Sequence, residues 1–255
     1  MTRRFLAARL VSGLMLTVAV LAPLEATAQG TAQRTFRPLT QAMLNNPDPA
    51  DWLMWRGGYA NWGYSPLDQI TPGNVNDLRL AWSWAFAPAG PGSTGMQVEP
   101  IVYDGVMYIR HANERYSAHD ATTGDIIWEY ARDLPEEITS GEAVFTVHRG
   151  RGVFLFEDRL IGHSTDGMLF ALDPRTGTLV WETEMTDYRA GQQPSGAPVV
   201  FNGAIAVPYN CSSWSAPDPC HLSAYDVESG EMLWRWHTSP TPEDPTHETL
   251  GDDPQ

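Results

Sequence analysis

One eleven-residue frame occurs three times in this 255-residue chain at constant spacing, and no other feature constrains the fold as strongly. Asp120, Asp173 and Asp226 each lie in the pattern Ala-x-Asp-x-x-x-Gly-x-x-x-Trp, and 53 residues separate each aspartate from the next. The three copies read AHDATTGDIIW, ALDPRTGTLVW and AYDVESGEMLW. Self-similarity at such a period is the signature of a repeat architecture in which each repeat is one supersecondary unit.

Each copy of the frame predicts a β-hairpin. The aspartate and the small polar residues after it favour a type I turn, and the glycine supplies the left-handed backbone that closes a bulged loop. The tryptophan then lies in the next strand, where its indole can pack against a neighbouring sheet while its N–H finds a carbonyl. We therefore expect Trp128, Trp181 and Trp234 to lock each repeat onto the next.

Alternating apolar residues and turn signals predict four short strands in every period. The expected strands are 100–103, 106–110, 115–120 and 126–131, then 152–157, 159–165, 168–173 and 179–184, then 198–201, 204–210, 221–226 and 232–237. Four strands per repeat make a propeller blade, and propellers close with roughly four to eight blades. The predicted fold class is all-β, a β-propeller of tryptophan-docked blades with about four blades here and an incomplete ring.

The first 28 residues look like a secretory signal peptide. Arg3, Arg4 and Arg9 precede an apolar run from Leu10 to Leu24, and Ala26-Thr27-Ala28 is a small-residue cleavage site. A membrane anchor is the alternative, but the run is shorter than the roughly 20 residues that span a bilayer. A periplasmic location is therefore expected. The formal net charge of −15 argues against nucleic acid or anionic membranes as partners.

The remaining chain divides into three parts. Residues 29–51 form a polar linker or an edge wrap with one candidate helical turn at 39–45, residues 52–238 form the partial propeller, and residues 239–255 form a Pro-rich acidic tail. Thr71 and Pro72 are typical of a helix start, so we expect a short helix to about Leu78. Leu80, Trp82 and Trp84 alternate and predict one strand of a further blade.

Several of these segments together resemble one enzyme family. The stretch YANWGYSPLDQITPGNVNDLRLAWSW, the DGVMY hairpin at 104–108 and the three docking frames are similar to the pyrroloquinoline quinone (PQQ) dependent alcohol dehydrogenases of bacterial periplasms. Docking frames also occur in a non-enzymatic outer-membrane assembly propeller, whereas the YSPLDQIT element belongs to the dehydrogenases. The resemblance spans roughly Trp55 to His237. It implies an eight-bladed propeller with PQQ and a Ca²⁺ or lanthanide ion on its axis.

The resemblance assigns three residues to one wall of the PQQ site. The family places a Glu three residues before the Pro that opens a blade, and this position holds Gln97, with Glu99 two residues on. Arg151-Gly152-Val153 is similar to the family's Arg-Gly-Val element, whose Arg contacts the ortho-quinone oxygens. The family also places a Ser or Thr three residues before the Pro that opens the next blade. Ser195, three residues before Pro198, resembles this residue and would hold a PQQ carboxylate.

The expected metal-binding position departs from the family. Where the family has a Gly-Ala-Glu segment whose Glu binds the metal, this chain has Cys211-Ser212-Ser213. A hard cation needs oxygen donors and prefers carboxylates, so Ser213 is a poor replacement. Either the inserted loop brings Asp218 to the metal, or the metal is bound weakly or not at all. Ser212 and Trp214 of this loop are further candidates for contact with PQQ, Trp214 by stacking unless it is an exposed loop residue.

The chain also lacks the adjacent cysteines that many relatives carry beside the quinone, since Phe145 and Thr146 occupy those positions. Its two cysteines, Cys211 and Cys220, flank the inserted loop SSWSAPDP. In an oxidising compartment we expect them to form a disulfide with each other.

Other polar residues are interpreted as structural. Asp120, Asp173 and Asp226 repeat at one turn position, and a single active site cannot use three equivalent turn residues. The histidines show no metal-ligand spacing and are expected to be structural; they are His111, His119, His148, His163, His221 and His237, while His247 lies in the acidic tail.

Two functions follow as hypotheses. The first is the N-terminal part of a PQQ-dependent alcohol dehydrogenase that oxidises an alcohol or polyol by hydride transfer to the quinone and passes electrons to a periplasmic acceptor such as cytochrome c. Its general-base Asp is expected beyond Gln255, so this chain would contain no catalytic residue and would be inactive alone. The second is a non-catalytic periplasmic propeller that acts as an assembly or binding protein.

Overall fold

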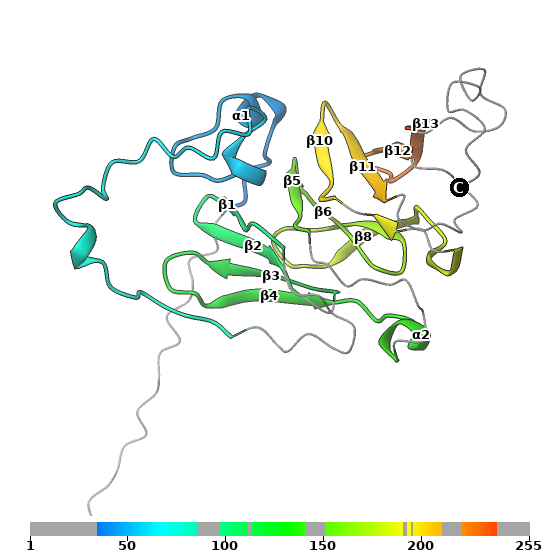
Figure 1. Ribbon diagram of the computed structural model, residues 1–255, viewed down its shortest axis with the longest axis horizontal. Coiled ribbons are helices and arrows are strands. Elements are labelled where there is room, and N and C mark those ends of the chain that lie inside the picture. The colour runs from blue at the N-terminus through cyan, green and yellow to red at the C-terminus, as the bar shows by residue number, and fades with distance from the viewer. Residues whose placement is uncertain are drawn as a thin grey trace, which may run out of the picture. The chain divides into compact units, whose positions relative to one another are not determined.

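The computed structural model describes residues 35–85, 97–111, 114–140, 151–190, 193–194, 196–210 and 221–238. Three antiparallel sheets follow one another along the chain (Figure 1). Each sheet runs in sequence order, with a short first strand at one edge and the tryptophan strand at the other. The all-β propeller with four-stranded blades is thereby confirmed.

The strand bounds agree with the predicted strands to within a few residues. The first blade contains β1 (Ile101–Tyr103), β2 (Val106–Arg110), β3 (Arg115–Asp120) and β4 (Ile126–Ala131). The second contains β5 (Phe154–Phe156), β6 (Arg159–His163), β7 (Met168–Leu172) and β8 (Leu179–Glu184). The third contains β10 (Val199–Phe201), β11 (Ala204–Asn210), β12 (His221–Asp226) and β13 (Met232–His237), with β9 (Gln193–Pro194) paired to β11.

The repeated aspartate builds the third turn of every blade. In the second blade the Oδ1 of Asp173 accepts the backbone N–H of Arg175 at 2.8 Å, and the backbone carbonyl of Asp173 accepts the N–H of Gly177 at 2.8 Å. The first and third blades repeat this arrangement with Asp120 and Asp226. A register shift in each strand pair accommodates the bulge. The structural role predicted for these aspartates is confirmed.

The tryptophans connect consecutive blades as predicted. Trp128 donates its indole N–H to the carbonyl of Pro174 at 2.8 Å, and Trp181 donates to the carbonyl of Val227 at 3.1 Å. Each indole lies over the turn of the next blade. Trp234, at the same position of the third blade, is 46% exposed.

The segment before the first blade contacts all three blades. α1 (Gln41–Asn45) begins at Thr40, whose hydroxyl accepts the N–H of Met43. Leu39 pairs with Glu157 beside β5, while Trp52 pairs with Val102 of β1. Leu39, Leu44 and Leu53 are buried in the core that the blades share. The backbone N–H of Asn202, between β10 and β11, donates to Oε1 of Gln41 at 2.7 Å, so residues 36–54 contact all three blades.

Two local predictions in the next segment are wrong. Residues 71–78 contain a turn and a single 3₁₀ turn, η2 (Val75–Asp77), instead of an α-helix. Gly, Asn and Asp residues fill this stretch and disfavour helix interiors. Residues 80–84 form no strand. Trp82 instead donates to the carbonyl of Ala121 at 3.2 Å, so it is a fourth docking tryptophan without a strand around it.

The remaining helices are short. They are η1 (Trp55–Gly57), α2 (Glu136–Thr139) and η4 (Tyr188–Ala190). None of the helices within the described residues has the length and apolarity needed to cross a membrane.

Candidate cofactor site

Three segments that each precede the first strand of a blade converge at one place. A Cβ placed on Gly152, before β5, would lie 3.8 Å from the Cβ of Ala197, before β10. It would lie 3.9 Å from the backbone carbonyl oxygen of Glu99, before β1. Of the three positions that the sequence analysis assigned to a cofactor site, Arg151 directly precedes Gly152 and Gln97 lies two residues before Glu99, while Ser195 lies outside the described residues.

Arg151 has the environment of a ligand-binding cation. The side chain is half-buried, and its Nε is inaccessible to water without a hydrogen-bond partner among the described residues. Gly152 follows with a φ of +105°, a conformation that other residues rarely adopt. An unsatisfied buried donor is costly, so an acceptor brought by a ligand would fit here.

The side chain of Glu99, whose backbone carbonyl lies beside Gly152, already has two hydrogen-bond donors. Glu99 accepts the indole N–H of Trp52 and the backbone N–H of Arg56, the latter at 3.1 Å. It therefore holds the segment before the first blade. Gln97 is exposed at the start of the same segment.

The other predicted site residues lie outside the described residues. They are Ser195, Ser212, Ser213, Trp214, Asp218 and the two cysteines, Cys211 and Cys220. Their roles stay predictions. Within the described ranges, no three His, Cys, Asp or Glu side chains gather in a group that could hold a metal ion.

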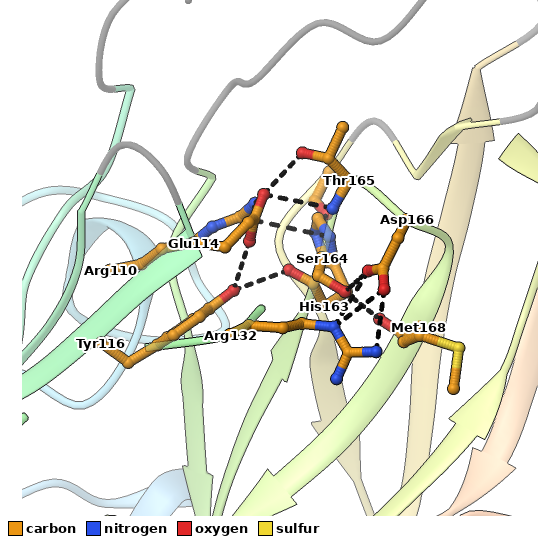
Figure 2. A network of polar contacts seen from close by, with 10 residues as sticks. Arg110, Glu114, Tyr116, Arg132, His163, Ser164, Thr165, Asp166 and Met168 are labelled. Atoms are coloured by element: carbon orange, nitrogen blue, oxygen red, sulfur yellow. Dashed lines mark hydrogen bonds and ion pairs between the residues drawn. The ribbon is translucent and has the colours of Figure 1, made fainter. Parts of the chain in front are cut away.

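A buried ion pair of the first blade receives further hydrogen bonds from the second blade (Figure 2). Arg110, at the end of β2, pairs with Glu114 at 2.8 Å, and both side chains are 2% exposed. Glu114 also accepts the hydroxyl of Tyr116 at 3.0 Å. From the second blade, the backbone N–H and the hydroxyl of Thr165 donate to it at 3.1 and 2.5 Å. The carboxylate is thus fully satisfied by donors from two blades.

His163 extends this network to the third blade. Its Nε2 lies 2.7 Å from the carbonyl oxygen of Gly196, and its Nδ1 lies 3.5 Å from an Nη of Arg110. A carbonyl only accepts, so Nε2 must carry the hydrogen and Nδ1 must offer its lone pair to Arg110. Burial and the cations of Arg110 and Arg151 lower the pKa of His163 to about 3. The imidazole is therefore neutral at neutral pH.

The sequence analysis did not foresee this network, because it interpreted His163 as structural and assigned no role to Arg110 or Glu114. Arg110 and His163 are separated by 53 residues and end equivalent strands of consecutive blades. The period could have pointed to their equivalence. The feature of the sequence that could have indicated it is Arg110, a charged residue at the end of an otherwise apolar strand.

Two further histidines, His111 and His119, interact within the first blade. The Nε2 of His111 lies 2.5 Å from the hydroxyl of Ser117, which lies 2.7 Å from the Nε2 of His119. The ring of Trp84 packs edge-on against both imidazoles. Burial and the neighbouring His119 lower the pKa of His111 to about 4. This cluster satisfies buried polar groups within one blade.

Comparisons with known proteins show the family of this chain. The family model "PQQ: Glucose/ethanol/alcohol dehydrogenase, beta-propeller domain" matches residues 52–254. The chain is 33% identical over 215 residues to the dehydrogenase subunit of a quinone alcohol dehydrogenase from Gluconobacter oxydans, covering 82% of this chain and 27% of that protein. The chain therefore spans less than a third of that relative's length.

Solved structures give the same result. The chain superimposes on the quinohemoprotein alcohol dehydrogenase ADHIIG from Pseudomonas putida HK5 with a TM-score of 0.68 and 29% identity, covering 81% of this chain and 30% of that one. A europium-containing methanol dehydrogenase gives a TM-score of 0.68 at 26% identity, covering 80% of this chain and 34% of that one. This chain belongs to the PQQ β-propeller family of glucose, ethanol and alcohol dehydrogenases.

Proposed function

We propose that this chain supplies one wall of the PQQ site in a dehydrogenase that oxidises an alcohol or polyol. Arg151 carries the proposal, because it directly precedes Gly152, where the segments before three blades converge, and its buried Nε has no partner among the described residues. PQQ bears carboxylates and quinone oxygens that accept hydrogen bonds from such a cation. The similar dehydrogenases support the assignment.

PQQ, when bound beside Arg151, would supply the acceptor for the hydride that leaves the alcohol. The role of Arg151 is to donate hydrogen bonds to oxygens that gain negative charge, and its planar fork suits two neighbouring acceptors. Gly152 lets the backbone turn closely beside this cation. The neutral imidazole of His163 adds no second positive charge there.

The wider assignments extend this proposal. A Ca²⁺ or lanthanide ion would accompany PQQ in the full-length protein, as the europium-containing relative suggests. A periplasmic acceptor such as cytochrome c would take the electrons. The leader at residues 1–28 supports export, which sequencing of the mature N-terminus would test.

The decisive experiment measures PQQ binding and turnover in the full-length protein reconstituted with PQQ and Ca²⁺. We expect Arg151→Lys to lower turnover on the order of 10²-fold, with a smaller loss of PQQ affinity, because Lys keeps the charge and loses the fork. Arg175→Lys is the matched control, since Arg175 pairs with Asp173 in the exposed turn between β7 and β8. Its turnover should equal that of the wild type.

Two results would overturn the proposal. Wild-type protein that does not bind PQQ would favour the alternative of a non-catalytic propeller. Unchanged turnover in Arg151→Lys would remove Arg151 from the cofactor site.

A further inference from the structure

We infer that His163 is a positioning residue of the cofactor site, which fixes the Gly196 turn beside the Arg151-Gly152 element. The inference rests on the proposed PQQ function. Its starting observation is the 2.7 Å hydrogen bond from Nε2 of His163 to the carbonyl oxygen of Gly196. This bond joins the end of β6 to the segment before β10, so it crosses from the second blade to the third.

The ion pair of Arg110 with Glu114 sets the orientation of the His163 ring. Arg110 faces its Nδ1, and Glu114 fixes Arg110 through a buried ion pair. Because a guanidinium only donates, the imidazole must present a lone pair to Arg110 and its one N–H to Gly196. The Arg110–Glu114 pair therefore selects the tautomer and aims the N–H at the turn.

Gly196 is confined from a second direction. A Cβ at this position would lie 2.7 Å from the Cγ of Pro208 on β11, which leaves no room for a side chain. The backbone thus packs directly against Pro208 while its carbonyl is held by His163. Two independent contacts define where the Gly196 turn lies.

The position of the Gly196 turn affects the packing beside Arg151. Ala197, the next residue, lies at van der Waals distance from the Cβ position of Gly152. Gly152 directly follows Arg151, whose charge in turn acts on His163. A displacement of the Gly196 turn would therefore alter the packing beside Arg151. His163 would act on the cofactor through this turn and not by touching it.

The test compares two amide variants in the full-length protein. His163→Gln places an amide N–H close to the position of Nε2 and keeps a bond to Gly196. His163→Asn reaches only the position of Nδ1, so it keeps a polar group facing Arg110 and loses that bond. His119→Asn is the matched control, since it shortens a buried imidazole of β3 that does not contact Gly196.

Two readouts are needed, one of them independent of PQQ. Hydrogen exchange of a peptide covering 193–200 in the PQQ-free protein should be faster in His163→Asn on the order of tenfold, with a similar rise in the dissociation constant for PQQ. His163→Gln and His119→Asn should remain within about twofold of the wild type. Exchange in β7 should not change in the His163 variants.

The outcomes separate this inference from the proposed function. Wild-type behaviour of His163→Asn in both readouts, or a His163→Gln protein as impaired as His163→Asn, would overturn the positioning role. If wild-type protein fails to bind PQQ, the proposed function falls. The exchange comparison then decides by itself whether His163 holds the Gly196 turn.

Discussion

The indole of Trp128 lies directly over Gly177 of the next blade. A Cβ at Gly177 would lie 2.5 Å from Cε3 of the ring, and the φ of Gly177 is +71°. The same tryptophan donates its N–H to the carbonyl of Pro174 in that turn. The close approach of ring and backbone therefore requires glycine for two reasons, the left-handed backbone and the missing side chain.

Replacing this glycine should destabilise the protein more than backbone strain alone. We expect Gly177→Ala to lower the free energy of unfolding by about 3 kcal/mol or more, from strain of about 1–2 kcal/mol plus displacement of the indole. Gly203→Ala is the control, because Gly203 has a φ of +77° while a Cβ there would lie 3.8 Å from Val227. Urea titration of both variants measures the difference. Equal losses of unfolding free energy would show that the indole moves aside without destabilising the protein.

The buried ion pair should behave as a coupled unit. Glu114→Gln leaves the Arg110 cation buried without its partner, so we expect a loss of about 3–5 kcal/mol in the free energy of unfolding. The double variant Arg110→Met/Glu114→Met should lose clearly less free energy of unfolding than the single variants Arg110→Met and Glu114→Met lose together. A double-mutant cycle from denaturant titrations checks this. Additive losses would mean that the two charges do not stabilise each other.

The protein should lose stability in mild acid because it buries neutral histidines. The unfolded chain binds a proton on His163 below about pH 6.5. In the folded protein, burial and the nearby cations of Arg110 and Arg151 lower that pKa to about 3, although the hydrogen bond to the Gly196 carbonyl acts in the opposite direction. The unfolded state thus takes up more protons between these values, so stability falls as the pH falls through this window.

The variant His163→Gln isolates this effect, since it keeps the hydrogen bond and cannot titrate. We expect wild-type protein to lose about 1–2 kcal/mol more than the variant between about pH 7 and pH 5. His111, with a pKa lowered to about 4, contributes to the remaining loss in both proteins. Denaturant titrations at the two pH values give the comparison, and parallel losses would contradict a neutral His163.

The cysteines of the inserted loop should be joined. A disulfide between Cys211 and Cys220 closes a small loop and would stabilise the folded protein by roughly 2 to 3 kcal/mol. Titration of the exported, denatured and unreduced protein should then detect no thiol. Two reactive thiols would show that the loop is held without a disulfide.

The sequence by itself determined the blades. The turn chemistry of Asp173 and Gly177 is local, and alternation of apolar residues marks strands one by one, so the twelve blade strands could be placed without knowing any distant contact. The predictions for residues 71–84 failed for the opposite reason. Local alternation cannot show whether a partner strand is available, and residues 80–84 form no strand although Trp82 still donates to the carbonyl of Ala121.

Only the tertiary structure decided the site. The period places Arg110 and His163 at equivalent positions, but it cannot show that they meet or that Glu114 and the Gly196 carbonyl fix their orientation. Partners this far apart in the chain are chosen by how blades pack, and burial sets both the protonation of His163 and the unsatisfied Nε of Arg151. These properties depend on exclusion of water, which no short stretch of sequence encodes.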